Sequence, residues 1–203
     1  MDISGLLSAF RTLEPYQALQ EDLERGELPA SLGLMRAARA PLVAGLAGDL
    51  NRPLLVVTGT VTRAQKLVQA LRDWSGGSAN LHRFPEPLTL FYDRAPWTEE
   101  IIIGRLRTLR ALSVLHDRDE SGRDGRSLIV VASARALMQR TLPLHQYRLS
   151  IREIGLGQLL DLERTLRRWA GLGYEPVSVV EGPGQFSHRG GIIDIFPPAH
   201  DLP

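Results

Sequence analysis

The chain contains no cysteine among its 203 residues. This absence excludes disulfide bonds, thiolate metal sites and cysteine nucleophiles together, and it is typical of a reducing compartment. A net charge is nearly absent too, because 24 basic side chains stand against 23 acidic ones and leave +1. Such a balance does not provide the broad positive field of an autonomous DNA-binding protein, so nucleic-acid binding would need a local patch.

Long hydrophobic runs are also missing. The N-terminus lacks a basic segment followed by an apolar run, and no window approaches the length of a membrane span. We therefore expect neither export nor membrane insertion. With 43% hydrophobic and 23% charged residues, the chain is expected to be a soluble globular protein that buries one core and part of another.

Motifs for catalysis or metal binding are absent as well. No nucleophile elbow and no paired carboxylates stand out in the sequence. The five histidines show no metal-ligand spacing such as H-E-x-x-H, and we expect no metal site and no catalytic residue. These histidines are His82, His116, His145, His188 and His200.

The first 25 residues are predicted to be a helical lead-in. Apolar residues recur at helical spacing over residues 5–25 and are interrupted by Pro15, which predicts two short helices rather than a long one. From residue 26 the pattern changes to alternating apolar strands and amphipathic helices. The run Leu54–Val57 is of the kind that is buried on both faces in a parallel sheet.

Further strands are predicted at residues 81–84 and 128–131. The strand at 54–57 is followed by a helix that starts at a cap, either Thr60 or Thr62, and whose apolar face runs from Ala64 to Trp74, and a second helix is predicted over 101–115. The second helix is expected to turn a stripe of apolar side chains inward. This stripe comprises Ile102, Leu106, Leu109 and Leu112. The repeated strand-helix-strand order predicts an α/β fold over residues 26–150, with a doubly wound, mostly parallel sheet.

A second, incomplete α+β domain is predicted over residues 151–203. Before it, the charged stretch 116–126 is expected to be a surface loop, a short helix to follow the strand at 128–131, and residues 147–154 to be extended. A helix is then marked by apolar residues and ended by glycines. These are Leu159, Leu162, Leu166 and Trp169, then Gly171 and Gly173. Beyond it the pattern is purely β.

A phosphate-binding loop is degenerate in this chain. The consensus G-x-x-x-x-G-K-[ST] uses its glycines to bring amides to phosphate, its lysine for the terminal phosphates and its hydroxyl for magnesium. In the segment that starts at Gly33, only the first glycine fits. Ala38, Arg39 and Ala40 replace the second glycine, the lysine and the hydroxyl residue, and Arg36 is one of the positions between the two glycine sites. We interpret it as an ordinary strand-helix turn that does not bind nucleotide.

The stretch Gly182–Pro198, G-P-G-Q-F-S-H-R-G-G-I-I-D-I-F-P-P, is the most informative part of the chain. On a strand, Phe186 and Arg189 point to opposite faces, and the glycine pair that follows bends the backbone. A β-branched run then resumes and ends at Pro197. This pattern predicts a small sheet that presents a surface, with either a hairpin or a bent strand at the glycines.

Three stretches together resemble the N-terminal, UvrB-like module of bacterial transcription-repair coupling factors. They are the degenerate loop at 33–40, the stretch from Phe84-Pro85 to Leu106, and residues 173–197. UvrB itself shares the third stretch, but it has a working phosphate loop and a long tyrosine-rich hairpin after its Phe-Pro. Here a short segment, whose aromatic residues are Phe91, Tyr92 and Trp97, takes the place of that hairpin.

The resemblance implies a non-catalytic, bacterial and cytoplasmic module that docks UvrA and has lost nucleotide and damage binding. In the parent family such a protein recruits nucleotide excision repair to stalled RNA polymerase. RNA polymerase and double-stranded DNA are then partners of other domains, and ATP and magnesium are cofactors of the motor domains, with none for this stretch. The alternatives are an ATP-dependent repair helicase fragment of UvrB type and a free-standing nucleotide-binding α/β protein.

The resemblance also implies candidate docking residues. Arg189 matches the arginine of the family's R-G-G pattern, and Phe186 matches the phenylalanine of its G-E-F pattern, although core packing is the first expectation for Phe186. Gln185 replaces the usual glutamate, and His188 occupies a variable position. Glu175 stands where some relatives place a basic residue used toward UvrA. In a separate interpretation, a cluster of basic side chains is expected to form a solvated helix face. They are Arg105, Arg107 and Arg110.

Overall fold

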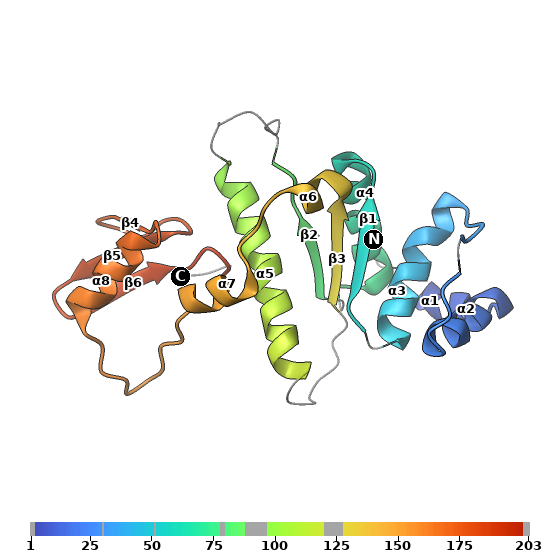
Figure 1. Cartoon of the computed structure of the whole chain (residues 1–203), viewed down its shortest axis with the longest axis horizontal. Coiled ribbons are helices and arrows are strands. Elements are labelled where there is room, and N and C mark those ends of the chain that lie inside the picture. Colours follow the sequence, from blue (N-terminus) through green and yellow to red (C-terminus); the bar gives the residue numbers. More distant parts are fainter. Residues whose placement is uncertain are drawn as a thin grey trace. The chain divides into compact units, whose positions relative to one another are not determined.

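The computed structural model describes residues 3–29, 31–50, 52–77, 80–87, 97–119 and 128–200. The chain divides into two compact units, residues 1–140 and 141–203, which are coloured along the sequence in Figure 1. Within the described residues, none of the helices is both long and apolar enough to cross a membrane. Phe91, Tyr92 and residues 120–126 of the predicted charged loop lie outside the described residues.

The lead-in forms two helices, α1 (Gly5–Arg11) and α2 (Glu14–Glu24). Pro15 lies in the first turn of α2, where its missing N–H costs no helical hydrogen bond. The prediction of two short helices is therefore confirmed. Leu7 packs into the core of the first unit, while Tyr16 and Leu19 pack against α3 (Arg39–Asp49).

Helix α3 follows a short 3-10 turn, η1 (Arg36–Ala38). The described residues before this turn, 27–29 and 31–35, form no strand. The expectation of a strand-helix turn at Gly33 is therefore wrong for the described residues. An irregular segment leads into α3 instead. Ala40, Leu42 and Leu46 are buried, so α3 is held by its own apolar side chains and does not need a strand before it.

A three-stranded parallel sheet forms the centre of the first unit, with β3 (Leu128–Ser133) between β1 (Leu54–Thr58) and β2 (Asn80–Phe84). All six residues of β3 are buried, as expected for a central strand covered on both faces. Helix α4 (Val61–Ser75) joins β1 to β2, begins at the capping hydroxyl of Thr60 and ends at the left-handed Gly76.

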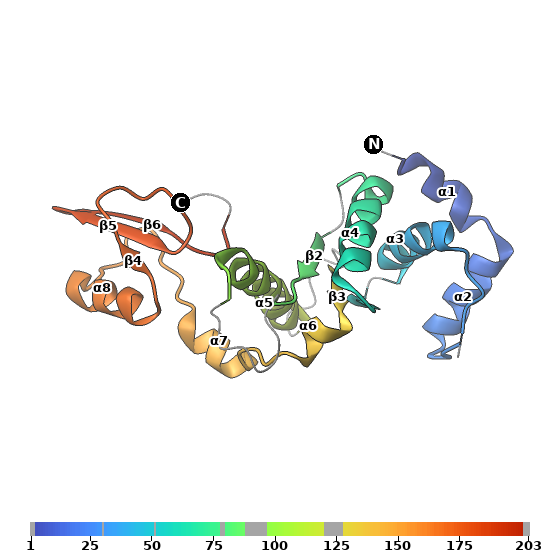
Figure 2. The ribbon, with the colours of Figure 1, turned by 90° about the horizontal axis from the view of Figure 1, so that it is seen from above.

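Helices cover both faces of this sheet (Figure 2). On one face, α3 and α4 pack Ala44, Val68 and Leu71 against Ile129 and Val131. On the other face lies α5 (Glu99–Asp119), and after β3 the chain forms the short α6 (Ala134–Met138). The first unit is thus an α/β fold with a parallel sheet, as the alternation of strands and helices predicted.

Two predictions of burial in this unit are wrong. The side chains of Leu55 and Val57 are 57% and 51% exposed, because β1 is the edge strand and α5 packs over β2 and β3. The inward face of α5 is also not the predicted apolar stripe. Ile101, Arg105 and Thr108 are buried, whereas two members of the stripe are about half exposed. These two are Ile102 and Leu112.

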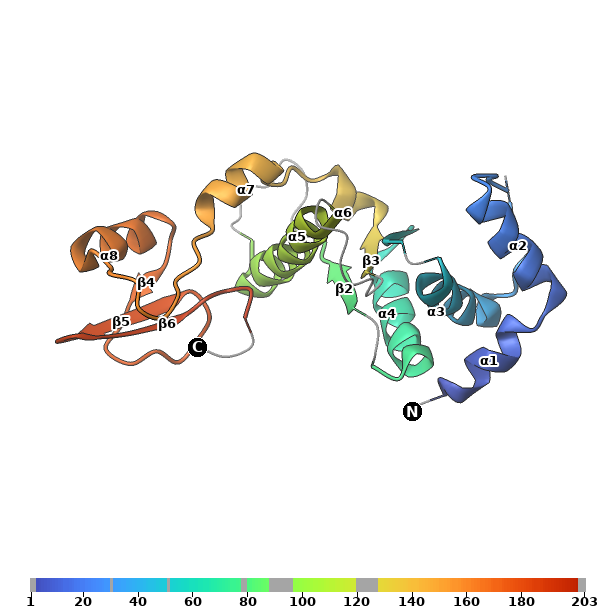
Figure 3. The same ribbon diagram turned by 90° about the horizontal axis from the view of Figure 1, so that it is seen from below.

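The second unit begins with α7 (Leu144–Ser150), where an extended segment over residues 147–154 was predicted. The prediction is wrong for residues 147–150, because they are helical. The helix buries Tyr147. Helix α8 (Leu162–Gly171) then lies against a small sheet (Figure 3). Its strands are β4 (Glu175–Pro176), β5 (Gln185–Arg189) and β6 (Ile192–Phe196), in that order.

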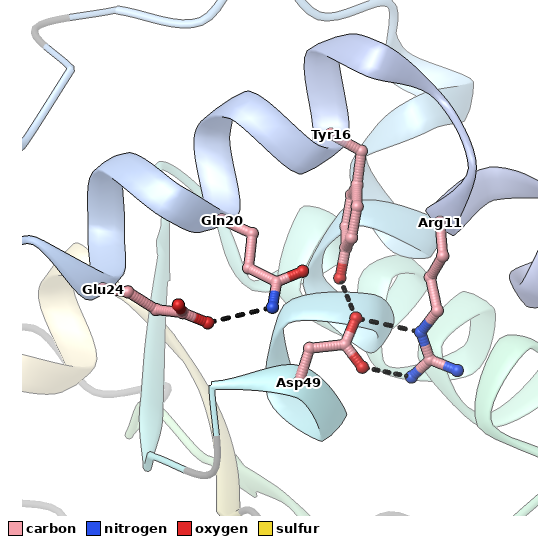
Figure 4. Close-up of polar contacts among 5 residues, drawn as sticks. All are labelled: Arg11, Tyr16, Gln20, Glu24 and Asp49. Carbon is pink, nitrogen blue, oxygen red and sulfur yellow. Dashed lines mark hydrogen bonds and ion pairs between the residues drawn. The ribbon is translucent and has the colours of Figure 1, made fainter.

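A polar cluster ties the lead-in to α3 (Figure 4). The Asp49 carboxylate accepts a hydrogen bond from the Tyr16 hydroxyl, with 2.5 Å between the oxygens, and contacts the Arg11 guanidinium at 2.9 and 2.8 Å. Asp49 is the last residue of α3, where a negative charge opposes the helix dipole, so the Arg11 cation offsets an otherwise unfavourable position. Burial, followed by the hydrogen bond to Asp49, raises the pKa of Tyr16 above its usual value.

Candidate functional site

The glycine pair of the C-terminal stretch forms a hairpin. Strands β5 and β6 are antiparallel, and Gly190 takes a left-handed φ of 58° at the turn, a conformation that glycine adopts without steric cost. The cross-strand register assigns side chains to faces, because paired residues lie on the same side of a sheet. Phe186 faces with Ile195, whereas Arg189 faces with Ile192. The predicted separation of Phe186 from Arg189 is confirmed.

One face of the hairpin is closed by α8. Phe186 is only 6% exposed and meets Trp169 edge to face, with 5.6 Å between ring centroids. Tyr174 lies beside the same indole at 6.4 Å, and burial raises the pKa of its hydroxyl. Phe186 is therefore a core residue, in agreement with the expectation that packing comes first.

Two other candidates shape the turns. The side-chain oxygen of Gln185 accepts hydrogen bonds from the backbone N–H groups of Glu181 and Gly182, at 3.0 and 2.9 Å. Nε2 of His188 lies 2.7 Å from the carbonyl oxygen of Gly190. Both polar groups thus have partners within the hairpin region, and their first effect is to fix its backbone.

The other face of the sheet is open at the hairpin end. The side chains of Arg189 and Asp194 are 67% and 47% exposed and lie 3.6 Å apart, a distance and exposure at which an ion pair contributes little. Ile192, paired with Arg189 across the turn, is 66% exposed. We call Arg189, Ile192 and Asp194 the hairpin patch.

Glu175 is also exposed, on the edge strand β4 in register with Gln185. Ile192 and Asp194 were missed by sequence reasoning, which treated the isoleucine run only as a strand. The signal was present, because a two-residue turn at the glycines puts Ile192 directly across from Arg189. The structure thus places Arg189, Gln185 and Glu175 on one face of the sheet, with Phe186 and His188 on the other.

Among the residues that the structure describes, no strand precedes the degenerate loop, and no side chain caps the helix that follows it. Ala38 precedes α3 without a side-chain hydrogen bond to the helix amides. Ala40, where a phosphate loop needs a hydroxyl, is 6% exposed and packs in the core. Gly33, Arg36 and Arg39 are exposed. Over the residues that can be described, no group of three histidine or acidic side chains is arranged to hold a metal ion.

The prediction of a solvated helix face is wrong for Arg105, which is 3% exposed. One of its guanidinium nitrogens donates to the carbonyl oxygens of Pro85 and Ala136, at 3.1 and 3.3 Å. The guanidinium also lies over the rings of Phe84 and Trp97, 4.0 and 4.9 Å from their centroids. Burial lowers its pKa to about 10, so it stays charged at neutral pH and ties α5 to the end of β2.

Residues 153–203 match the family model described as the UvrB interaction domain. The chain is 31% identical over 194 residues to a transcription-repair-coupling factor of Myxococcus xanthus, an alignment that covers 93% of this chain and 15% of that protein. The protein of the same name from Bacillus subtilis is 28% identical over 171 residues, covering 84% of this chain and 14% of the relative. The chain therefore spans about 15% of the length of these relatives.

Proposed function

We propose that this chain, which is related over most of its length to transcription-repair coupling factors and carries a UvrB interaction domain, binds the repair protein UvrA through the hairpin patch. The resemblance to the UvrB-like module of such factors, drawn first from three stretches of sequence, is confirmed by these similarities. The single observation that supports the docking surface is an exposed Arg189 beside an exposed Ile192, within the matched domain.

Arginine and large apolar side chains are the groups that contribute most to protein interfaces. In the hairpin patch, the arginine gains little from its loose pair with Asp194, so it can exchange that contact for a partner carboxylate at small cost. Gln185 and His188 then act by holding the turns, and Phe186 acts by holding the sheet on α8. Arg189, Ile192 and Asp194 make the contact.

The proposed activity of this stretch is binding alone, with neither catalysis nor a cofactor. The α/β unit precedes the docking unit in the chain, and its degenerate phosphate loop is the remnant of an ancestral nucleotide-binding fold that no longer uses ATP. In a longer coupling factor, UvrA bound here would be recruited to stalled RNA polymerase. Motor domains with ATP and magnesium, acting on double-stranded DNA, belong to other parts of such a protein.

Calorimetric titration of the full chain with purified UvrA tests the docking surface. Arg189→Ala is expected to weaken binding by about 1–3 kcal/mol, or about 5- to 150-fold, because it removes a charged interface hydrogen bond. Ile192→Ala is expected to weaken it by about 1 kcal/mol through lost apolar contact. Arg63→Ala, the same charge loss at an exposed position of α4, serves as the matched control.

Wild-type affinity in both Arg189→Ala and Ile192→Ala, with unchanged circular dichroism, would remove the hairpin patch from the interface. Binding of ATP by the chain would instead favour the two nucleotide-binding alternatives. Micromolar affinity for ATP with magnesium, lost in Arg39→Ala, would show that the loop at 33–40 still works.

A further inference from the structure

We propose that arginines on α8 and on the segment before it form a binding groove for the phosphodiester backbone of a nucleic acid. The groove is shallow and open to solvent, with a volume of about 690 Å³, and the residues that line it are all arginines. They are Arg152, Arg164, Arg167 and Arg168. We call this feature the arginine groove.

Helix α8 presents three of these side chains on its outer side. Thr165 and Trp169 are buried on the side that faces the sheet, so Arg164, Arg167 and Arg168 stand together on the exposed side. Residues three and four apart are neighbours on a helix surface, with about 5–6 Å between their Cβ atoms. The three guanidinium groups therefore lie within one turn of a regular, packed element.

The fourth arginine is brought to the groove by a hydrogen bond. Nη2 of Arg168 donates to the carbonyl oxygen of Leu149 at 2.7 Å. This bond holds the chain that leaves α7 beside α8, and Arg152 follows three residues later. The groove thus depends on a specific contact between segments that are distant in sequence.

The positive charge of the groove is only partly compensated. Arg167 forms an ion pair with Glu163 at 3.4 Å, but the two side chains are 73% and 83% exposed, so the pair contributes little. Among the described residues, no ion pair is found for the other three arginines of the groove. Residues 148–168 contain five arginines against three carboxylates, a local excess of +2.

The rest of this unit has the opposite sign. Residues 171–203 contain one arginine and four carboxylates, a local excess of −3. The near-neutral total of the chain therefore hides a separation of charge within its second unit. A local patch of this kind is what nucleic-acid binding requires in a chain with no broad positive field.

A phosphate backbone fits the groove better than an acidic protein segment does. Protein interfaces are centred on apolar or aromatic anchors, and the groove lining offers none. Contacts to a nucleic-acid backbone are made largely by guanidinium and ammonium groups with phosphate oxygens. The convergence of four cations favours phosphate here, whereas the choice of arginine does not, because 23 of the 24 basic residues of the chain are arginine.

The arginine groove and the hairpin patch lie on different sides of the second unit. Helix α8 packs on the sheet face that carries Phe186, and the groove lies on the outer side of that helix. Arg189 lies on the opposite sheet face. A nucleic acid in the groove therefore leaves the hairpin patch accessible, and this inference does not depend on UvrA binding.

Fluorescence anisotropy of the full chain with a labelled 20-base-pair duplex and a labelled 20-nucleotide single strand tests the groove. Nonspecific binding with a Kd of about 10⁻⁵–10⁻⁴ M is expected near physiological salt. If four phosphates are neutralised, the slope of log K against log salt for the duplex is about −3.6, so affinity falls about 150-fold between 50 and 200 mM. Binding of either strand form supports the proposal, and the tighter of the two identifies the form preferred.

The double variant Arg164→Ala/Arg167→Ala is expected to halve that slope, leaving a fall of about 12-fold over the same salt range. Arg168 is left intact because it holds Leu149. Arg63→Ala on α4 is the matched control and is expected to keep the wild-type slope. The double variant is also expected to bind UvrA as the wild type does, which separates this test from that of the hairpin patch.

Several results would overturn the proposal. The first is the absence of binding to both strand forms at 50 mM salt, and the second is a double variant with unchanged affinity and slope. A third is tighter binding of a 20-residue polyglutamate than of either strand, which would assign the groove to an acidic protein segment. A fourth is that inorganic phosphate saturates the groove in a titration monitored by NMR while neither strand form binds.

Discussion

Removal of one hydroxyl group should loosen the lead-in from α3. Tyr16 is 3% exposed, and its O–H donates to the carboxylate of Asp49 (Figure 4). Hydrogen bonds to charged groups contribute about 1.5–3 kcal/mol. In Tyr16→Phe the carboxylate keeps its contact with Arg11 and is 20% exposed, so some solvation is recovered. We therefore expect a loss of about 1.5–2 kcal/mol.

Amide hydrogen exchange measured by mass spectrometry on peptides from α2 reports this local loss directly. The expected free-energy change corresponds to exchange about 10- to 30-fold faster in Tyr16→Phe. Gln20→Ala is the matched control on the same helix, because it breaks only the exposed hydrogen bond to Glu24. Its effect is expected to stay near twofold, as for surface substitutions in general.

The pH dependence supplies a second arm of the same test. Burial raises the pKa of Tyr16 in the folded chain, so the unfolded chain releases this proton first. The stabilisation is therefore complete below about pH 10 and falls above it by about 1.4 kcal/mol per pH unit until the folded group ionises. Tyr16→Phe should lack this decline. Equal α2 exchange in Tyr16→Phe and Gln20→Ala, with the same decline in both, would refute the reasoning.

Two further predictions follow from close contacts in the first unit. A Cβ at Gly45 would lie 2.7 Å from the Tyr16 hydroxyl oxygen, so Gly45→Ala should cost about 1–3 kcal/mol by overpacking. Gly48→Ala should cost less because it meets only the Arg11 terminus at 2.9 Å, and equal thermal shifts in the two variants would contradict this. Burial, and then the charge of Arg107, lowers the pKa of His82. The stability that neutral His82 contributes is therefore complete above about pH 6.5 and is lost as pH falls. In His82→Gln, the free energy of unfolding measured in urea should depend less on pH between pH 7 and 5.

The sequence predicted strands and helices well where their own side chains decide burial. The run at residues 128–131 is a central strand, and the similar run at 54–57 is a strand as well. Yet the two differ in burial, because β3 has a neighbour on each side and β1 has one. Apolar composition indicates that a strand can be buried, but the position of the strand in the sheet decides whether it is.

Helix α5 shows a different limit. Helical spacing allows either Ile102 or Arg105 to face the sheet, and hydrophobicity favours the isoleucine. The structure buries the arginine because the carbonyl oxygens of Pro85 and Ala136 and two aromatic rings converge on it. These partners come together only after the strands have paired, so no local pattern contains them.

The candidate site was predictable in part. Strand alternation alone separated Phe186 from Arg189, and the structure confirms that separation. The contribution of Ile192 and Asp194 depends on the register of β6, which is set by the turn at Gly190. The sequence left a hairpin and a bent strand open at that point, and the open face could not be assigned without that choice.

The bonds made by Gln185 bear on how this surface can change in evolution. A single side-chain oxygen accepts both backbone N–H groups of the preceding loop, and a glutamate carboxylate has the same oxygen in the same place. Exchange between the two residues therefore preserves loop shape while adding or removing one negative charge on the sheet face that also carries Arg189. Position 185 can tune the electrostatic preference for a partner independently of the backbone that presents it.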